Sequence, residues 1–193
     1  MDTAYIALGS NLPSSSGSPE QTLDAALTRI QALGELTAVS SFYSTEPVGY
    51  ADQPSFVNAA IALRTALTPS ALLEQLLAIE LEFGRDRGHG IANGPRTLDL
   101  DLLLYNDFVL KTQTLELPHP RMADRLFVLA PLGEIAPESI HPTLRKSVSE
   151  LLQVHQHSEE DFPHVLRHSE AVDPVQPSDN PVSNAPVSSV DPV

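Results

Sequence analysis

The 193-residue sequence has no cysteine, no long hydrophobic run and few basic residues. The absence of cysteine excludes disulfide bonds and thiolate metal sites, and it fits a reducing compartment. No apolar run approaches the roughly 18 residues that a membrane-spanning helix needs, and the first residues lack the basic and then apolar pattern of a signal peptide. We therefore expect a soluble, cytoplasmic protein built from one domain and an appendage.

The shortage of basic residues excludes a further class of protein. Lys and Arg number 11 against 25 Asp and Glu, and the formal net charge is −14. A general nucleic-acid-binding protein shows a basic surface and aromatic stacking motifs, and neither is present. Half of the basic residues in 1–155 nevertheless lie on the two sides of one aspartate pair in the sequence: Arg85, Arg87, Arg96, Arg121 and Arg125. This concentration predicts binding of a compact anion.

The aspartate pair lies in residues 94–104, Gly-Pro-Arg-Thr-Leu-Asp-Leu-Asp-Leu-Leu-Leu. Alternation of Asp99 and Asp101 with the leucines at 98, 100, 102 and 104 predicts a β-strand with one buried face. Two carboxylates then project from one face, roughly 7 Å apart, and Mg²⁺ is usually held by one or two carboxylates together with substrate phosphates. Arg96 suits phosphate oxygens. The pattern indicates a metal–phosphate site, and the alternative is a solvent-facing pair on an amphipathic strand.

Hydrophobic periodicity predicts an α+β fold. Strands are expected at 3–8, 37–43 and 56–63 and around the aspartate pair, with helices at 19–33 and 69–83. The order β-α-β-β-α-β is a split βαβ, or ferredoxin-like, sandwich. Extra C-terminal elements are expected as helical turns at 123–135, interrupted by Pro131, and a short helix at 148–154.

The chain divides into a folded domain at 1–155 and a tail at 156–193. The tail is rich in Pro, Ser, Val and Asp, a composition that cannot bury enough apolar surface to offset the entropy of ordering it. We expect it to be disordered, with a weak tendency to form helix near 162–167. Its deletion is expected to leave stability and activity nearly unchanged.

Three further features suggest a binding site, and each has a structural alternative. Residues 84–95 contain four glycines and are expected to form a lid that brings Arg85 and Arg87 over phosphates, unless they form only a solvated connector. Phe56 and Asn58 share a strand face and offer a stacking surface and an amide to a flat heterocycle, or simply begin a strand. His119 lies between two prolines, which fix its backbone, and a lone histidine at such a position is usually structural.

The sequence resembles the 6-hydroxymethyl-7,8-dihydropterin pyrophosphokinase family of folate biosynthesis. The similarity runs from about residue 5 to residue 141 and rests on separated stretches in the family's order: 5–12 (Tyr-Ile-Ala-Leu-Gly-Ser-Asn-Leu), 41–45, 52–60, 94–103 and 117–120. The resemblance implies the ferredoxin-like fold, a catalytic domain at 1–155, and Mg²⁺-dependent transfer of pyrophosphate from ATP to 6-hydroxymethyl-7,8-dihydropterin with release of AMP.

The resemblance also implies roles for individual residues. Asp99 and Asp101 are expected to bind two Mg²⁺ ions and, with Arg85, Arg87 and Arg96, to act in catalysis. The residues expected to bind ATP are Glu80, Arg85, Arg96, His119 and Arg125. Those expected to bind the pterin are Thr45, Val48, Phe56, Asn58 and Phe127. A monomer without nucleic-acid or membrane partners is expected.

Two other functions remain open at this point. One is a ferredoxin-like module that binds nucleotide and leaves it intact. The other is transfer of the terminal phosphate alone, which would yield ADP.

Overall fold

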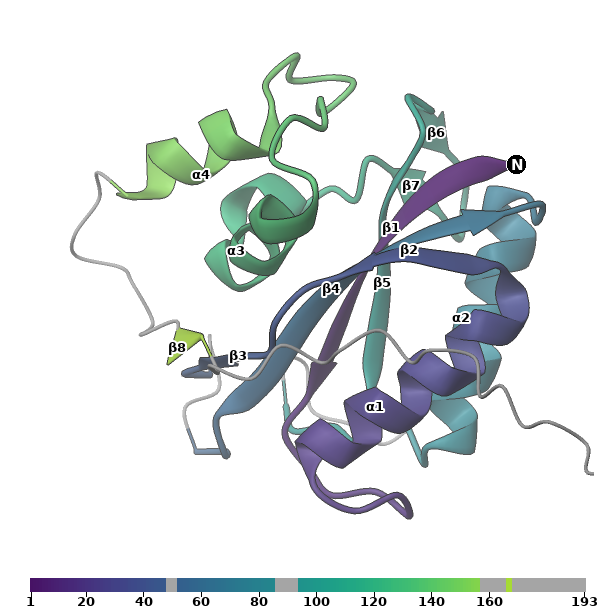
Figure 1. The fold of residues 1–193 in the computed structure, drawn as a ribbon, viewed down its shortest axis with the longest axis vertical. Coiled ribbons are helices and arrows are strands. Elements are labelled where there is room, and N and C mark those ends of the chain that lie inside the picture. The colour runs from purple at the N-terminus through teal and green to yellow at the C-terminus, as the bar shows by residue number, and fades with distance from the viewer. Residues whose placement is uncertain (48–51, 86–93, 157–165, 168–193) are drawn as a thin grey trace, which may run out of the picture.

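The computed structural model describes residues 1–47, 52–85, 94–156 and 166–167, so the predicted site residues Val48 and Arg87 lie outside the described residues. The fold is mixed α+β, with an antiparallel sheet and, in the described ranges, four α-helices (Figure 1). The sheet strands are β1 (Asp2–Ser10), β2 (Glu35–Val39), β3 (Tyr43–Thr45), β4 (Phe56–Thr65), β5 (Asp99–Tyr105) and β8 (Leu166–Arg167). The helices are α1 (Pro19–Ile30), α2 (Pro69–Glu82), α3 (Leu126–Ile135) and α4 (Val148–Gln156).

The sheet order is β5-β1-β4-β3-β8, and β2 also pairs with β4. All of these pairings are antiparallel. Short elements complete the fold: the 3₁₀ helices η1 (Gln31–Leu33) and η2 (Met122–Asp124), and the hairpin of β6 (Leu110–Lys111) with β7 (Glu116–Leu117). Among the described residues, no helix is both long enough and apolar enough to cross a membrane.

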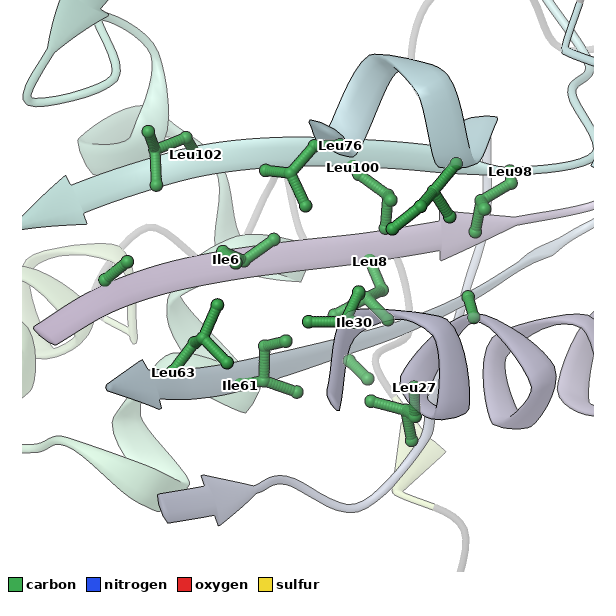
Figure 2. Packing of buried hydrophobic residues seen from close by; sticks show 14 of the residues in the cluster. Ile6, Leu8, Leu27, Ile30, Ile61, Leu63, Leu76, Leu98, Leu100 and Leu102 are labelled. Carbon is green, nitrogen blue, oxygen red and sulfur yellow. The ribbon is translucent and has the colours of Figure 1, made fainter. Parts of the chain in front are cut away.

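The larger core lies between the sheet and helices α1 and α2. Figure 2 shows Ile6 and Leu8 of β1 packed with leucine and isoleucine side chains of the neighbouring strands and of both helices. The two helices begin where the sequence predicts. Ser18 forms a capping box with Gln21 before Pro19, and the Thr68 hydroxyl accepts from the Ala71 amide before Pro69. Each cap satisfies amide groups that have no partner inside the helix.

Helices α3 and α4 cover part of the opposite sheet face. Their buried side chains pack against Ala60 of β4 and against Leu103 and Leu104 of β5. This second cluster is smaller than the first, so the ends of β1, β4 and β5 beyond it are free to carry polar groups. That part of the sheet holds the candidate site.

The strand expected at 37–43 is in fact two strands, β2 and β3, separated by residues 40–42. The Ser40 amide donates to the Ala60 carbonyl, and the Ala60 amide donates to the Ser40 hydroxyl, at 2.9 Å in both cases. A side-chain oxygen thus replaces the backbone carbonyl at this position, and the regular ladder is interrupted.

Two other expectations about local structure were wrong. Leu104 does not share a face with Leu98, Leu100 and Leu102, because the β1–β5 register shifts at Leu103 and turns Leu104 into the second cluster. Pro131 does not interrupt its helix but lies inside α3. It lacks the N–H group for one helical hydrogen bond, and its burial offsets that loss.

Residues 166 and 167 were expected to lie in a disordered tail and instead form β8, which pairs with β3. The exposed edge of β3 offers unpaired backbone groups that a short extended segment can satisfy. The other residues of the predicted tail beyond 156 lie outside the described ranges.

Candidate active site

The site is built on neighbouring positions of three strands. In the sheet, Gly9 of β1 pairs with Asn58 of β4 on one side and with Asp99 of β5 on the other. Two residues along β1, Ala7 pairs with Asp101. Since side chains alternate along a strand, Asp99 and Asp101 share one face, as the sequence predicted. Small residues of the central strand therefore separate an amide on β4 from two carboxylates on β5.

Asp99 lies between two arginines. Its Oδ2 is 3.0 Å from Arg96 Nε and its Oδ1 is 3.4 Å from Arg85 Nη2, and all three side chains are 18% exposed. Such limited exposure reduces solvent screening of the charges. Asn11 anchors the segment that carries Arg96, since its Oδ1 accepts from the Arg96 amide at 2.8 Å.

Asp101 is more exposed, at 31% of its side chain, and its partners are looser. Its Oδ2 is 3.6 Å from Arg125 Nη1 and 4.0 Å from His119 Nε2. Burial lowers the pKa of His119, Arg125 and Arg121 lower it further, and Asp101 raises it in part. The imidazole is therefore neutral near pH 7. Because Nδ1 accepts from the Arg121 amide, the proton lies on Nε2, toward Asp101.

Each of the two carboxylates is linked through an arginine to an aromatic ring. The Arg96 guanidinium lies 4.7 Å from the centroid of Phe56, and that of Arg125 lies 5.4 Å from the centroid of Phe127. Both distances are typical of cation–π contacts. Two sets of contacts, each made of a ring, a guanidinium and a carboxylate, thus connect the predicted pterin residues to the predicted metal ligands.

The structure brings the other described pterin residues to the same place. Thr45 pairs with Phe56 across β3 and β4, and the buried Asn58 donates from Nδ2 to Thr45 Oγ1 at 2.8 Å. Thr45, Phe56 and Asn58 therefore form one polar and aromatic wall.

Glu80 does not lie at the surface of this site. Its side chain is fully buried, and Oε1 accepts from the Leu100 amide at 2.8 Å, which fixes α2 to β5. The expected contact with nucleotide stays a prediction.

Sequence reasoning missed the contribution of residues 9–11. The first strand was expected to end at residue 8, because Gly, Ser and Asn follow it, but β1 continues to Ser10. The Ser10 hydroxyl donates to the Thr97 carbonyl at 2.6 Å, and Asn11 donates to Gln53 and to the Pro54 carbonyl. No local pattern signals that the strand extends this far, because Gly, Ser and Asn are all common turn residues.

The two carboxylates of Asp99 and Asp101 are suitable ligands for a hard divalent cation. In the described ranges, no group of three or more His, Asp or Glu side chains is arranged to hold a metal ion. Two carboxylates on one face suffice for Mg²⁺ when phosphate oxygens complete its coordination, and oxygen ligands are those it prefers. The residues therefore fit Mg²⁺ bound together with a phosphate-bearing substrate.

Comparison with known proteins gives a consistent result. Residues 5–137 match the family described as 7,8-dihydro-6-hydroxymethylpterin-pyrophosphokinase (HPPK). The 2-amino-4-hydroxy-6-hydroxymethyldihydropteridine pyrophosphokinase of Bacillus subtilis is 50% identical over 134 residues, covering 68% of this chain and 77% of that protein. Its counterpart in Haemophilus influenzae is 46% identical over 144 residues, covering 74% of this chain and 86% of that protein.

Solved structures agree on the fold. Wild-type HPPK-DHPS of Plasmodium falciparum superimposes with a TM-score of 0.63 at 16% sequence identity, over 80% of this chain and 44% of that one. The chain thus spans less than half the length of that protein. At this level of identity the likeness concerns the fold alone.

Proposed function

This chain belongs to the 7,8-dihydro-6-hydroxymethylpterin-pyrophosphokinase family, and we propose that Asp99 and Asp101 bind Mg²⁺ for its reaction. The family transfers pyrophosphate from ATP to hydroxymethyldihydropterin in folate biosynthesis, so the chain is a diphosphokinase with ATP as co-substrate. The observation that carries the proposal is the pair of carboxylates on one sheet face, each flanked by an arginine that also lies over an aromatic ring.

Mg²⁺, with two ions expected, would neutralise the triphosphate and orient it against the attacking hydroxyl. Asp99 and Asp101 would supply oxygen ligands from a rigid strand. Their present partners are arginines, which suit phosphate oxygens as well as carboxylates. When nucleotide binds, the arginines would therefore exchange their carboxylate partners for phosphate groups, and the carboxylates would become available to bind Mg²⁺.

The cationic side chains would stabilise charge on the phosphates. Arg85 and Arg96 lie within 3.4 Å of Asp99, and Arg125 lies 3.6 Å from Asp101. Arg87 is proposed to act with them by family resemblance. Neutral His119 would donate from Nε2 to a phosphate oxygen. Such preorganised donors are worth most in a site that excludes water.

Thr45, Phe56, Asn58 and Phe127 would bind the pterin, together with Val48. The hydroxymethyl oxygen would attack the β-phosphorus of ATP, and the bond from that phosphorus to the oxygen bridging the α-phosphate would break. The bridging oxygen leaves with AMP, and the hydroxyl proton passes to water. No strong general base is required, since phosphoryl-type transfer depends mainly on positioning and electrostatics.

The ferredoxin-like topology, the domain bounds, the oligomeric state and the cellular location are also proposals. The order β1-α1-β2-β4-α2-β5 with β5-β1-β4-β2 adjacency supports a ferredoxin-like sandwich. We further propose a catalytic domain at 1–155 and a monomeric protein of the cytoplasm.

The test is to identify the nucleotide product when the purified protein meets ATP, Mg²⁺ and 6-hydroxymethyl-7,8-dihydropterin. Pterin-dependent AMP, lost on chelation of Mg²⁺ and regained on its return, is the expected result. ADP would mean transfer of the terminal phosphate alone. Intact ATP with Mg²⁺-dependent nucleotide binding would mean a nucleotide-binding module without catalysis.

A further inference from the structure

Gly9 occupies the centre of the site and has no side chain. It is the residue of β1 that pairs with both Asn58 and Asp99. A Cβ atom at this position would lie 3.1 Å from Asn58 Oδ1 and 4.0 Å from Asp99 Cβ. The first distance is tighter than ordinary van der Waals contact, and the second is ordinary.

The backbone gives no reason for glycine at this position. Gly9 lies inside a β-strand, and its φ is outside the positive region that Gly17 and Gly84 adopt. Alanine would fit this backbone, and glycine within a strand costs about 0.5–1 kcal/mol relative to alanine. The reason for glycine is therefore the space above its Cα atom.

We propose that Gly9 is a positioning residue that keeps the floor of the site open between the Asn58 amide and the Asp99 carboxylate. Asn58 and Asp99 lie on strands two steps apart, which separates their backbones by roughly 10 Å. A bicyclic pterin with its one-carbon arm has this length scale, so its hydroxymethyl group would cross above Gly9 toward the metal-bound phosphates. The inference rests on the function proposed above.

A methyl group at position 9 would act on one side of the site only. Asn58 Oδ1 would have to move, yet Asn58 is only 6% exposed and its Nδ2 is held by Thr45 Oγ1 at 2.8 Å. A shift of Asn58 would therefore also move its partner Thr45, and both residues are proposed to bind the pterin. On the other side, the methyl group would meet Asp99 at an ordinary contact distance, so the carboxylate and its arginine partners would stay in place.

The experiment compares Gly9→Ala with Gly133→Ala. Gly133 lies in α3 on the side that packs against α4, and a Cβ there would meet, among the described residues, only Leu152 Cδ2 at 3.4 Å and Val148 Cγ1 at 3.9 Å, both ordinary contacts. Both variants add one methyl group to a buried or half-buried glycine. The measurements are kcat and KM for 6-hydroxymethyl-7,8-dihydropterin, the Kd of the protein for α,β-methylene-ATP in the presence of Mg²⁺, and the Tm of each variant.

Gly9→Ala is expected to lower kcat/KM for the pterin by at least about tenfold, since small misplacements at a reacting centre have large effects. Its affinity for α,β-methylene-ATP should stay within about twofold of the wild type, because the Asp99 side is undisturbed. Gly133→Ala should change neither quantity. Unchanged pterin kinetics in Gly9→Ala would overturn the inference, and so would an equal loss of nucleotide affinity or a large fall in Tm, which would indicate a structural role. Failure of the wild-type protein to form AMP would instead contradict the proposed function.

Discussion

Asp99 and Asp101 are two residues apart on one strand, yet their surroundings differ. Among the described residues, Asp99 has two arginines at 3.0 and 3.4 Å, whereas Asp101 has one at 3.6 Å and is more exposed. Asp99→Ala and Asp101→Ala are each expected to lower kcat by at least about 10²-fold, the scale of losing one preorganised electrostatic group. Steady-state AMP formation at saturating ATP and pterin measures the loss.

The matched control is Asp107→Ala, which removes an exposed carboxylate just after β5. Its turnover should equal that of the wild type. Near-full turnover in both Asp99→Ala and Asp101→Ala would exclude these carboxylates as metal ligands.

Single residues were predictable where the pattern was local. Alternation along 98–102 placed both aspartates on one face, and the structure confirms this. The same rule failed at Leu104, because the bulge at Leu103 depends on the pairing of β1 with β5. Gly9 escaped notice for a similar reason. What matters there is the distance to Asn58 Oδ1 on another strand, and no local pattern reports it.

Glu134 joins two elements that carry residues proposed to bind the pterin. From α3, its carboxylate accepts from the Ser41 amide at 3.1 Å, the Ser41 hydroxyl at 2.9 Å and the Tyr43 hydroxyl at 2.8 Å. Helix α3 also carries Phe127, and β3 carries Thr45. Glu134→Ala is expected to raise KM for the pterin several-fold more than KM for ATP, because the helix and the strand would lose their common anchor.

Stability should fall in the same variant by about 1–3 kcal/mol, the usual value of hydrogen bonds to a charged acceptor at a partly exposed site. Thermal melts and separate titrations of the two substrates measure these effects. Glu138→Ala, which removes an exposed carboxylate just beyond α3, is the control. Equal changes in both KM values would show that Glu134 does not act on the pterin side.

Strand β8 changes the expectation for deletion of the C-terminal segment. It pairs with β3 in the register Tyr43–Arg167 and Ser44–Leu166. A chain ending at residue 156 should therefore be less stable than one ending at residue 168, by about 1–2 kcal/mol for two lost backbone pairs, or a few degrees in Tm. Differential scanning calorimetry of the two chains, with the full-length protein beside them, makes the comparison. Equal melting of all three would show that β8 adds nothing to the sheet.

Whole elements were predictable where they are long or begin with a clear signal. The proline-led caps at Ser18 and Thr68 fixed the starts of α1 and α2. Elements of two residues, such as β6, β7 and β8, are too short to show a period. The division between β2 and β3 depends on a hydrogen bond from Ala60, 20 residues away from Ser40, which no local pattern reveals.

At the scale of the whole molecule, the concentration of arginine in an acidic chain predicted a compact anionic ligand. The fold gathers Arg85, Arg96 and Arg125 around the aspartate pair, although they are up to 40 positions apart in the sequence. Composition alone predicts that these arginines bind an anion. The antiparallel arrangement of β1, β4 and β5 brings the Asn58 amide and the Phe56 ring beside them, and helix α3 adds the ring of Phe127.

Two histidines should make the stability of the folded protein depend on pH. Burial is the main cause that lowers the pKa of His119 and of His141 below the ordinary value of 6.5. The unfolded chain therefore binds more protons than the folded protein between the lowered pKa values and 6.5. Stability should be constant with respect to these groups above that window and should fall as the pH falls through it.

His141 lies outside the candidate site and allows this effect to be tested separately from catalysis. Its Nδ1 accepts from the Leu144 amide and lies 3.2 Å from Thr143 Oγ1, and the amide oxygen of asparagine can accept in the same way. His141→Asn should match the wild type in Tm at pH 8 and lose less Tm between pH 7 and pH 5, because one titrating group with a lowered pKa is gone. Parallel decreases in the two proteins over that range would mean that His141 takes no part, and that His119 or the carboxylates carry the whole dependence.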